Sequence, residues 1–163
     1  MFVDAAPRDR EVAGRPIRVG MIGTGATGRA IAFQLGTPAP GIRLVAISNR
    51  TIQHGERAYR EVGITNWQRA ESSRDAGSLI SRGTPVLTDD PSVLTRCDGV
   101  DIIVEVTGTV TAAASTNLDA FRSGKHVVLV NTELDSFVGP SLKAKADQEL
   151  SSPTRTEMNL ASR

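Results

Sequence analysis

Short apolar runs alternate with longer amphipathic stretches along most of the chain. The apolar runs, several of them rich in β-branched residues, predict strands over residues 16–22, 42–47, 86–88, 100–106 and 126–130. The stretches between them predict helices over residues 26–35, 51–62, 111–122 and 140–150, a helical turn that starts at Asp90-Pro91, and a loop with one short helix over residues 64–83. Because strands that alternate with helices form a parallel sheet with helices on both faces, the sequence predicts a doubly wound α/β fold.

Six residues, Gly23 to Gly28, connect the first predicted strand to the first predicted helix and read Gly-Thr-Gly-Ala-Thr-Gly. In such a turn Gly23 lets the chain leave the strand sharply, Gly25 lets the backbone approach a pyrophosphate, and Gly28 lets the helix pack close to the strand. The helix N-terminus offers unpaired N–H groups and a positive dipole end to phosphates. This context favours a Rossmann-type dinucleotide site over a tight turn without a ligand. The residues of this turn that are expected to bind the cofactor are Gly23, Thr24, Gly25, Ala26, Thr27 and Gly28.

The end of the second predicted strand indicates which dinucleotide to expect. In this fold an acidic residue about 20 residues beyond the glycines binds the adenosine ribose hydroxyls and selects NAD. This chain has Ser48-Asn49-Arg50 there and no carboxylate. Ser48 and Asn49 can donate to phosphate oxygens, and Arg50 adds a permanent positive charge, so the trio predicts NADP, with NAD as the alternative. The other interpretation of Arg50 is a surface charge at the start of the next helix.

Two further strand ends face the same predicted crevice. Thr107 and Gly108 follow the fourth predicted strand and Asn131 follows the fifth, so we expect all three to contact the cofactor, Asn131 at the nicotinamide carboxamide or ribose. Glu105 lies within an otherwise apolar strand. This carboxylate is expected either to accept hydrogen bonds from loop amides or to face the ligand.

The two ends of the chain lie outside the repeating pattern. Residues 1–15 carry mixed charge without periodicity and predict an N-terminal arm or short cap, residues 16–149 form the predicted dinucleotide-binding domain, and residues 150–163 predict an irregular tail. A two-halved nucleotide-binding sheet usually has six strands. No segment after residues 126–130 qualifies, so we expect a sheet that is incomplete at the sixth strand.

Composition and charge narrow the possible functions. The length of 163 residues suits one domain with its own core, and a net charge of +1 gives no support for a nucleic-acid partner. A single cysteine, Cys97, excludes an internal disulfide and fits a reducing compartment. Without a signal peptide or a long apolar run, the chain is expected in the cytoplasm and away from membranes. His54 and His126 have no partner at metal-ligand spacing, so no metal site is expected.

Three passages resemble the cofactor domain of homoserine-dehydrogenase-like oxidoreductases. They are Ile-Arg-Val-Gly-Met-Ile-Gly-Thr-Gly at residues 17–25, Asp-Ile-Ile-Val-Glu-Val-Thr-Gly at residues 101–108 and Gly-Lys-His-Val-Val at residues 124–128. The glycine motif is shared with many families, whereas the combination of the second and third passages is more specific. The resemblance implies an NAD(P)-dependent dehydrogenase domain with Gly23, Gly25 and Gly28 at the pyrophosphate. It also implies that Thr107 and Gly108 lie near the nicotinamide half.

The chain departs from the family pattern at two points. Homoserine dehydrogenases typically have Ala-Asn-Lys after the third passage, and that lysine serves the cofactor and the active site. Here Asn131 is followed by Thr132 and Glu133, which is similar to the subgroup that carries a C-terminal SAF-type domain. The family's catalytic domain follows the cofactor domain, and this chain ends before it, so no catalytic residue is assigned.

We therefore expect the NADP-binding domain of an oxidoreductase related to homoserine dehydrogenase, which transfers a hydride between nicotinamide and a carbonyl or alcohol substrate. The chain alone is expected to bind the cofactor without turning over a small-molecule substrate. The sequence is compatible with a homo-oligomer. One alternative is a stand-alone nucleotide-binding or redox-sensing module. The other is an S-adenosylmethionine-dependent methyltransferase, which generally needs an acidic residue where Ser48-Asn49-Arg50 stands.

Overall fold

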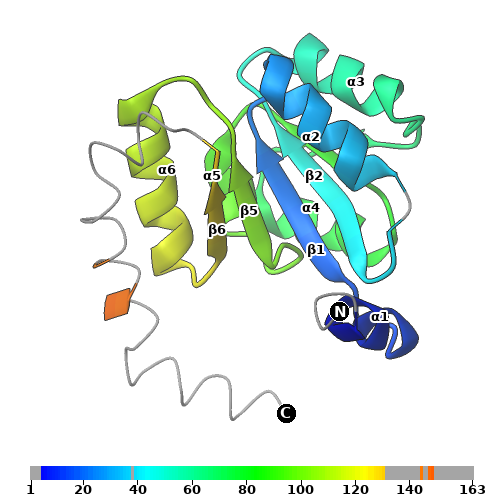
Figure 1. Cartoon of the computed structure of the whole chain (residues 1–163). Helices are drawn as coiled ribbons and strands as arrows, with labels where there is room; N and C mark the ends of the chain where they lie inside the picture. The colour runs from blue at the N-terminus through cyan, green and yellow to red at the C-terminus, as the bar shows by residue number, and fades with distance from the viewer. Residues whose placement is uncertain (1–4, 38, 131–143, 145–146, 149–163) are drawn as a thin grey trace.

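The computed structural model describes residues 5–37, 39–130, 144 and 147–148, and its centre is a six-stranded parallel sheet (Figure 1). The strands are β1 (Ile17–Ile22), β2 (Ile42–Ser48), β3 (Gln68–Arg69), β4 (Val86–Thr88), β5 (Ile102–Glu105) and β6 (His126–Leu129). The helices are α1 (Ala5–Val12), α2 (Ala26–Gly36), α3 (Ile52–Glu61), α4 (Ser73–Ser81), α5 (Pro91–Thr95) and α6 (Val110–Arg122). Across the sheet the strand order is β3-β4-β2-β1-β5-β6, so the direction of winding reverses between β1 and β5.

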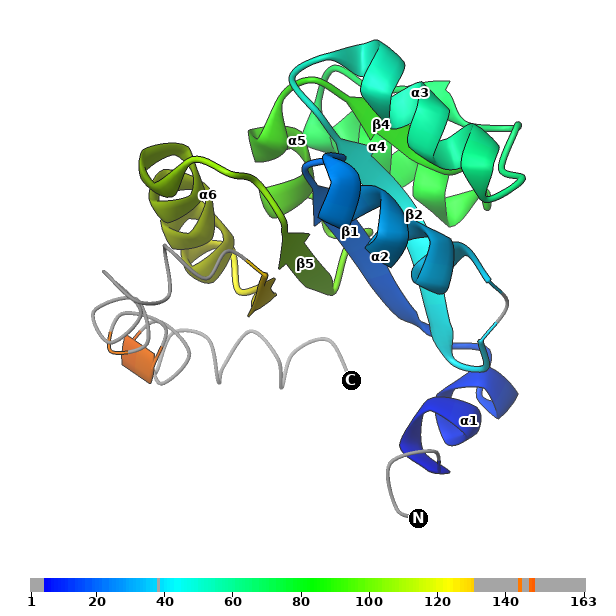
Figure 2. The same cartoon turned by 45° about the horizontal axis from the view of Figure 1, so that its top comes forward.

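Helices cover both faces of this sheet, and α2 and α3 lie side by side on one of them (Figures 1 and 2). In β4 and β5 successive residues alternate between two separate cores, as a pleated strand requires. The core beneath α2 and α3 contains Val19, Met21, Ala32, Leu44, Ile47, Ala58, Tyr59, Leu87 and Val104. The core beneath α4, α5 and α6 includes Ile22, Ala46, Leu79, Ile80, Val86, Leu94, Ile103 and Ala120. The predicted doubly wound α/β fold is therefore confirmed.

The strand register brings the carboxyl ends of the central strands to one edge. Ile22, the last residue of β1, pairs with Ser48 of β2 and with Glu105 of β5, and Ser48 also pairs with Thr88 of β4. The loops that leave these residues therefore start side by side. In open α/β sheets ligands bind in the crevice outside this edge, next to the strand where the winding reverses.

The sheet differs from the prediction at its other edge. Residues 64–83 are predicted as a loop with one short helix, yet they also contribute β3, which pairs with Val86 and Leu87 of β4. Both residues of β3 are exposed, so this segment lacks the alternation that reveals a half-buried strand. The sixth strand thus lies at the edge opposite to β6. A strand beyond β6 would fall on residues 131–143, which lie outside the described residues.

The structure describes most of the predicted N-terminal arm and only a few residues beyond position 130. Within the predicted arm or cap, Ala5–Val12 form helix α1, and Glu11 accepts a hydrogen bond at 2.8 Å from the Gly41 amide and pairs with Arg43. Polar contacts therefore hold α1 at the start of β2, far from the carboxyl edge of the sheet (Figure 1). Most of the predicted helix over residues 140–150, and the whole of the tail after it, lie outside the described residues.

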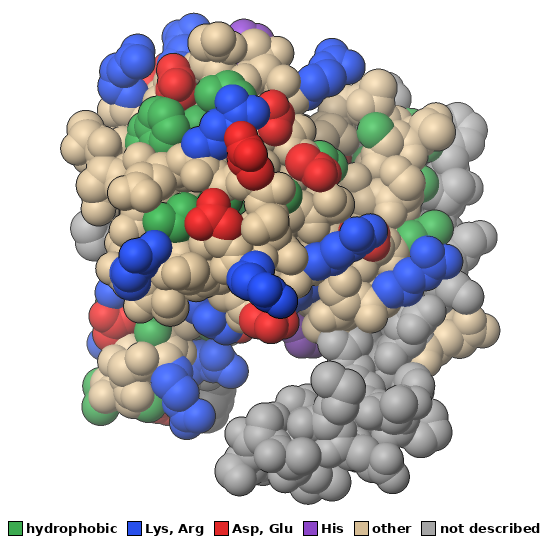
Figure 3. Space-filling model, turned by 180° about the vertical axis from the view of Figure 1, so that it is seen from behind, with side chains coloured by type: hydrophobic (Ala, Val, Ile, Leu, Met, Phe, Trp, Pro, Cys, Tyr) green, Lys and Arg blue, Asp and Glu red, His purple; other side chains and the backbone are tan. Residues whose placement is uncertain are grey.

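The surface offers no single-sign patch on the face that Figure 3 shows. Basic and acidic side chains are interspersed there over the described residues. Among the helices that the structure describes, none combines the length and apolar character that crossing a bilayer requires.

Candidate cofactor site

The glycine turn between β1 and α2 has a geometry that two of its glycines make possible. Gly23 has a φ of +98°, and a Cβ at this position would lie 2.9 Å from the backbone carbonyl of Val106. A Cβ at Gly28 would lie 2.5 Å from the carbonyl oxygen of Gly23. No side chain fits such spaces, so both positions need glycine for the turn to pass against the end of β5 and for α2 to pack on the turn.

Gly25 is different, because its side-chain position faces open space. A Cβ there would meet no heavy atom within 4 Å, and Gly25, Ala26 and Thr27 are all exposed. Gly25 is the N-cap of α2, and no side chain caps the helix. The first-turn N–H groups and the positive end of the helix dipole therefore face an accessible cradle. Backbone donors and room for close approach are the two features that a pyrophosphate site requires.

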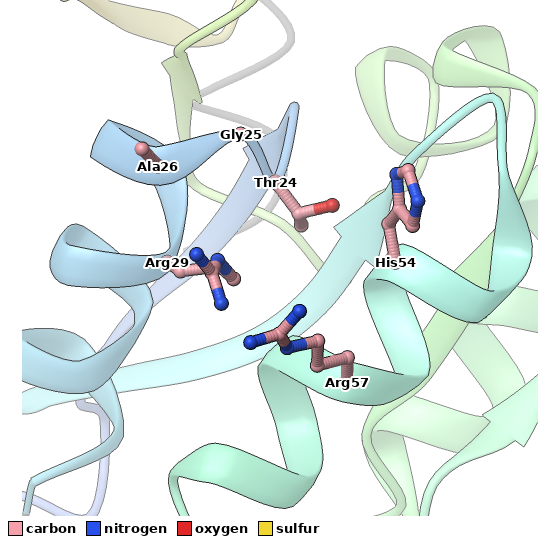
Figure 4. Close-up of a pocket in the computed structure, with 6 residues that line it drawn as sticks. All are labelled: Thr24, Gly25, Ala26, Arg29, His54 and Arg57. Carbon is pink, nitrogen blue, oxygen red and sulfur yellow. The ribbon is translucent and has the colours of Figure 1, made fainter.

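A pocket of about 200 Å³ opens beside this cradle, between α2 and α3 (Figure 4). Its lining residues are Thr24, Gly25, Ala26, Arg29, His54 and Arg57. The guanidinium groups of Arg29 and Arg57 approach each other from the two helices, and the Thr24 hydroxyl points toward His54 (Figure 4). The pocket therefore combines the helix N-terminus with hydrogen-bond donors from the side chains of Arg29, His54 and Arg57.

Glu61, the last residue of α3, forms ion pairs with both Arg29 and Arg57. Its Oε1 accepts hydrogen bonds from Arg57 Nε at 2.8 Å and from Arg29 Nη1 at 2.9 Å. The hydrogen bond from Arg57, reinforced by the charge of Arg29, holds the pKa of Glu61 below its ordinary value. One carboxylate faces two guanidiniums, so the pocket keeps a net positive charge that suits an anion.

The three residues predicted at the end of β2 have different surroundings. Ser48 is 1 % exposed, and its carbonyl accepts a hydrogen bond from the Gly23 amide at 2.9 Å. Asn49 Oδ1 accepts from the Thr24 amide at 3.0 Å, and its Nδ2 donates to the Thr51 carbonyl at 2.8 Å. Ser48 and Asn49 thus tie the glycine turn to β2 and α3. Only Arg50 is exposed.

Glu105 and Thr107 are hydrogen-bonded to each other at the end of β5. The Thr107 amide donates to Glu105 Oε1 at 2.8 Å, and the Thr107 hydroxyl donates to the same oxygen. Glu105 is fully buried, and burial raises its pKa. The expected bond to a loop amide is therefore present, while the Thr107 hydroxyl is already engaged. Gly108 is exposed, and Asn131 lies outside the described residues.

Sequence reasoning missed three of the residues that line the pocket: Arg29, His54 and Arg57. His54 and Arg57 are three positions apart on α3, so they share one face of that helix, and Arg29 directly follows the glycine motif. This spacing is a signal, but only the packing of α2 against α3 brings the three side chains together. No group of three or more His, Cys, Asp and Glu residues suited to a metal ion occurs in the described part of the chain.

Solved dehydrogenases share this fold. A homoserine dehydrogenase from Thiobacillus denitrificans matches over 83% of this chain and 28% of its own, with 25% identity and a TM-score of 0.62. The myo-inositol dehydrogenase of Lactobacillus casei, solved with NAD(H) and myo-inositol, matches over 85% of this chain and 34% of its own, with 23% identity and a TM-score of 0.59.

A 3-ketoreductase from Actinomadura kijaniata, solved with NADP and TDP-benzene, matches over 83% of this chain and 35% of its own, with 23% identity and a TM-score of 0.59. The chain thus spans about a third of the length of each of these three proteins. No curated protein matches it significantly. Residues 23–151, well over half of the chain, match the family described as "Homoserine dehydrogenase, NAD binding domain", and the chain therefore belongs to that family.

Proposed function

We propose that the chain is the NADP-binding domain of an oxidoreductase related to homoserine dehydrogenase. The observation that carries this proposal is the open cradle at Gly25, which stands at the uncapped N-terminus of α2. The neighbouring glycines, Gly23 and Gly28, bring the backbone into the compact turn that leaves this space. Backbone N–H groups of the turn would hold the pyrophosphate there.

The proposed cofactor extends along the carboxyl edge of the sheet. When bound, it supplies or accepts a hydride at its nicotinamide ring. Thr107 and Gly108 follow β5 at this edge and are our candidates for the nicotinamide half, together with Asn131. The half-buried Thr107 and the exposed Gly108 form the beginning of the loop into α6.

The choice of NADP over NAD is supported by charge. No carboxylate follows β2, where one would select NAD by binding the ribose hydroxyls. Arg50 is exposed there, and Arg29 and Arg57 line the adjoining pocket. A phosphate monoester would be attracted by these cations, whereas a carboxylate would repel it. The similar solved proteins include complexes of both kinds, with NAD(H) and with NADP.

Calorimetric titration of the 163-residue chain with NADPH, NADH and S-adenosylmethionine tests the proposal. We expect NADPH to bind about tenfold more tightly than NADH, or better, because charged hydrogen bonds to the extra phosphate add to shared contacts. Equal affinities for NADPH and NADH would overturn the NADP assignment. Binding of S-adenosylmethionine in preference to both would overturn the dinucleotide function.

The variant Arg50→Ala tests the predicted role of this exposed arginine. We expect it to weaken NADPH by about 3- to 10-fold and to leave NADH nearly unchanged, because only NADPH presents a phosphate to this side chain. The two dissociation constants are measured by the same titration. An equal loss for both dinucleotides would show that Arg50 does not recognise the phosphate.

The reaction and its substrate are proposed only for the larger protein. Hydride transfer to or from a carbonyl or alcohol needs a substrate-binding part, and the match covers only 28% and 34% of the two dehydrogenases. We propose that the chain alone binds the cofactor without turnover. Thiol-based redox sensing has little support, because Cys97 is fully buried and burial raises the pKa of its thiol.

A further inference from the structure

One side chain in the pocket, Thr24, has a buried hydroxyl without a hydrogen-bond partner among the described residues. Thr24 is only 4 % exposed, and its Oγ1 has no hydrogen-bond partner among the residues that the structure describes. Buried hydroxyls in folded proteins nearly always have a partner, because an unpaired one loses its hydration without compensation. In Figure 4 this oxygen points into the pocket between α2 and α3. A group that enters this pocket would be in position to give the hydroxyl a partner.

The other groups around the pocket define the chemistry of that partner. Arg29 of α2 and His54 and Arg57 of α3 can all donate hydrogen bonds, as can a threonine hydroxyl. The structure places no carboxylate among the lining residues, and Glu61, which pairs with both guanidiniums, is not one of them. Donors that converge on one space, with an excess of positive charge, fit a compact anion with several acceptor oxygens.

We propose that this pocket binds the 2′-phosphate of NADP through Thr24, Arg29, His54 and Arg57, and that the exposed Arg50 adds a contact from outside the pocket. This inference rests on the proposed function and names the residues that select the cofactor. The pyrophosphate has its own cradle at Gly25, whereas His54 and Arg57 belong to α3, the helix that follows β2, where the adenosine ribose lies in this fold. The Asn49 side chain is hydrogen-bonded within the protein and Ser48 is buried, so both position the turn and leave the phosphate to the pocket.

The variant Arg57→Ala provides the first test. We expect it to weaken NADPH by about 10- to 100-fold and NADH by less than about 2-fold, because the lost bond is charge-assisted and specific to the phosphate. Arg60→Ala is the matched control: it removes the same charge from an exposed position on the same helix, outside the pocket. It should leave the ratio of the two affinities unchanged. A ratio unchanged in Arg57→Ala as well would overturn the inference.

The variant Thr24→Val provides a second test with two independent readouts. Valine keeps the shape of threonine and removes only the unpaired hydroxyl, so the melting temperature should stay the same or rise. NADPH affinity should nevertheless fall by about 3- to 10-fold while NADH affinity is kept. A fall in melting temperature with no change in NADPH affinity would mean that the hydroxyl serves the fold, and would overturn its assignment as a ligand.

Two fragments distinguish failure of this inference from failure of the proposed function. Adenosine 2′,5′-bisphosphate and adenosine 5′-monophosphate differ only in the 2′-phosphate, and the first should bind more tightly to the native chain but not to Arg57→Ala. If neither NADPH nor NADH binds, the dinucleotide function is wrong. The difference in affinity between the two fragments then tests by itself whether the pocket binds a 2′-phosphate. Equal losses of NADPH and NADH in Arg57→Ala would assign the pocket to the pyrophosphate instead.

Discussion

Glu105 is a buried carboxyl whose two oxygens have unequal surroundings. Oε1 accepts hydrogen bonds from the amide and hydroxyl of Thr107, whereas Oε2 has no partner among the described residues. Burial raises the pKa of Glu105, and the hydrogen bonds from Thr107 oppose this effect only in part. The sequence shows the isolated carboxylate within an apolar strand, but only the structure shows that Thr107 turns back to meet it.

The variant Glu105→Gln tests this environment through the pH dependence of stability. The folded pKa lies above the ordinary value of 4.5, so the folded state binds its proton more tightly than the unfolded chain does. The free energy of unfolding therefore falls as the pH rises from about 4.5 through the folded pKa. Glutamine cannot ionise, so the variant should lack this loss in urea unfolding measured across the same pH range. The same pH slope in both proteins would contradict the assignment.

The element that determines the site is the junction of β1, the glycine turn and α2. The local sequence specifies the shape of this junction almost completely, because each glycine is needed for a different local reason. Gly23 adopts a positive φ, Gly28 has no room for a Cβ, and Gly25 leaves space in front of the helix. The three positions therefore predict three different responses to the same substitution.

Alanine at Gly28 and at Gly25 should separate packing from binding. Gly28→Ala places a Cβ against the Gly23 carbonyl, so we expect a loss of about 1–3 kcal/mol in the free energy of unfolding and a loss of NADPH binding. Gly25→Ala meets open space, so stability should fall by less than about 1 kcal/mol, while NADPH affinity falls by about tenfold or more because the methyl group fills the cradle. Urea unfolding and calorimetric titration measure the two effects. Unimpaired binding in Gly25→Ala would contradict the pyrophosphate site.

At the scale of the whole molecule, the candidate site joins elements from both halves of the described sheet. The turn after β1 contacts the end of β5 through Gly23, and Asn49 connects it to the start of α3. Arg29 and Arg57 extend this connection from α2 to α3 through Glu61. A ligand that bridges these elements binds only the folded chain and must therefore stabilise all of it.

Thermal unfolding in the presence of cofactor tests this coupling. At a concentration of NADPH about 100 times its dissociation constant, binding adds about 2.7 kcal/mol to the free energy of unfolding. For a domain of this size, the melting temperature should rise by roughly 5–10 °C. The same concentration of S-adenosylmethionine should produce no rise. A rise confined to one of two separate unfolding transitions would show that the site does not couple the elements named above.

The sequence by itself determined the alternation of strands and helices, the glycine turn and the absence of an acidic residue after β2. These features are local, because backbone sterics and hydrophobic periodicity act over a few neighbouring residues. It could not determine β3, which has two exposed residues and exists only because β4 offers an unpaired edge.

Only the tertiary structure decided which charged residues share the pocket. Arg29 and Arg57 are 28 positions apart, and they meet because Ala32, Ala58 and Tyr59 pack α2 and α3 into one core over the sheet. Tertiary structure also decided that Asn49, which the sequence predicts as a phosphate ligand, connects the glycine turn to the start of α3 through its side chain. The physical reason is the same in both cases: the partners of a polar side chain depend on which elements pack together, and nonlocal burial of apolar surface decides that packing.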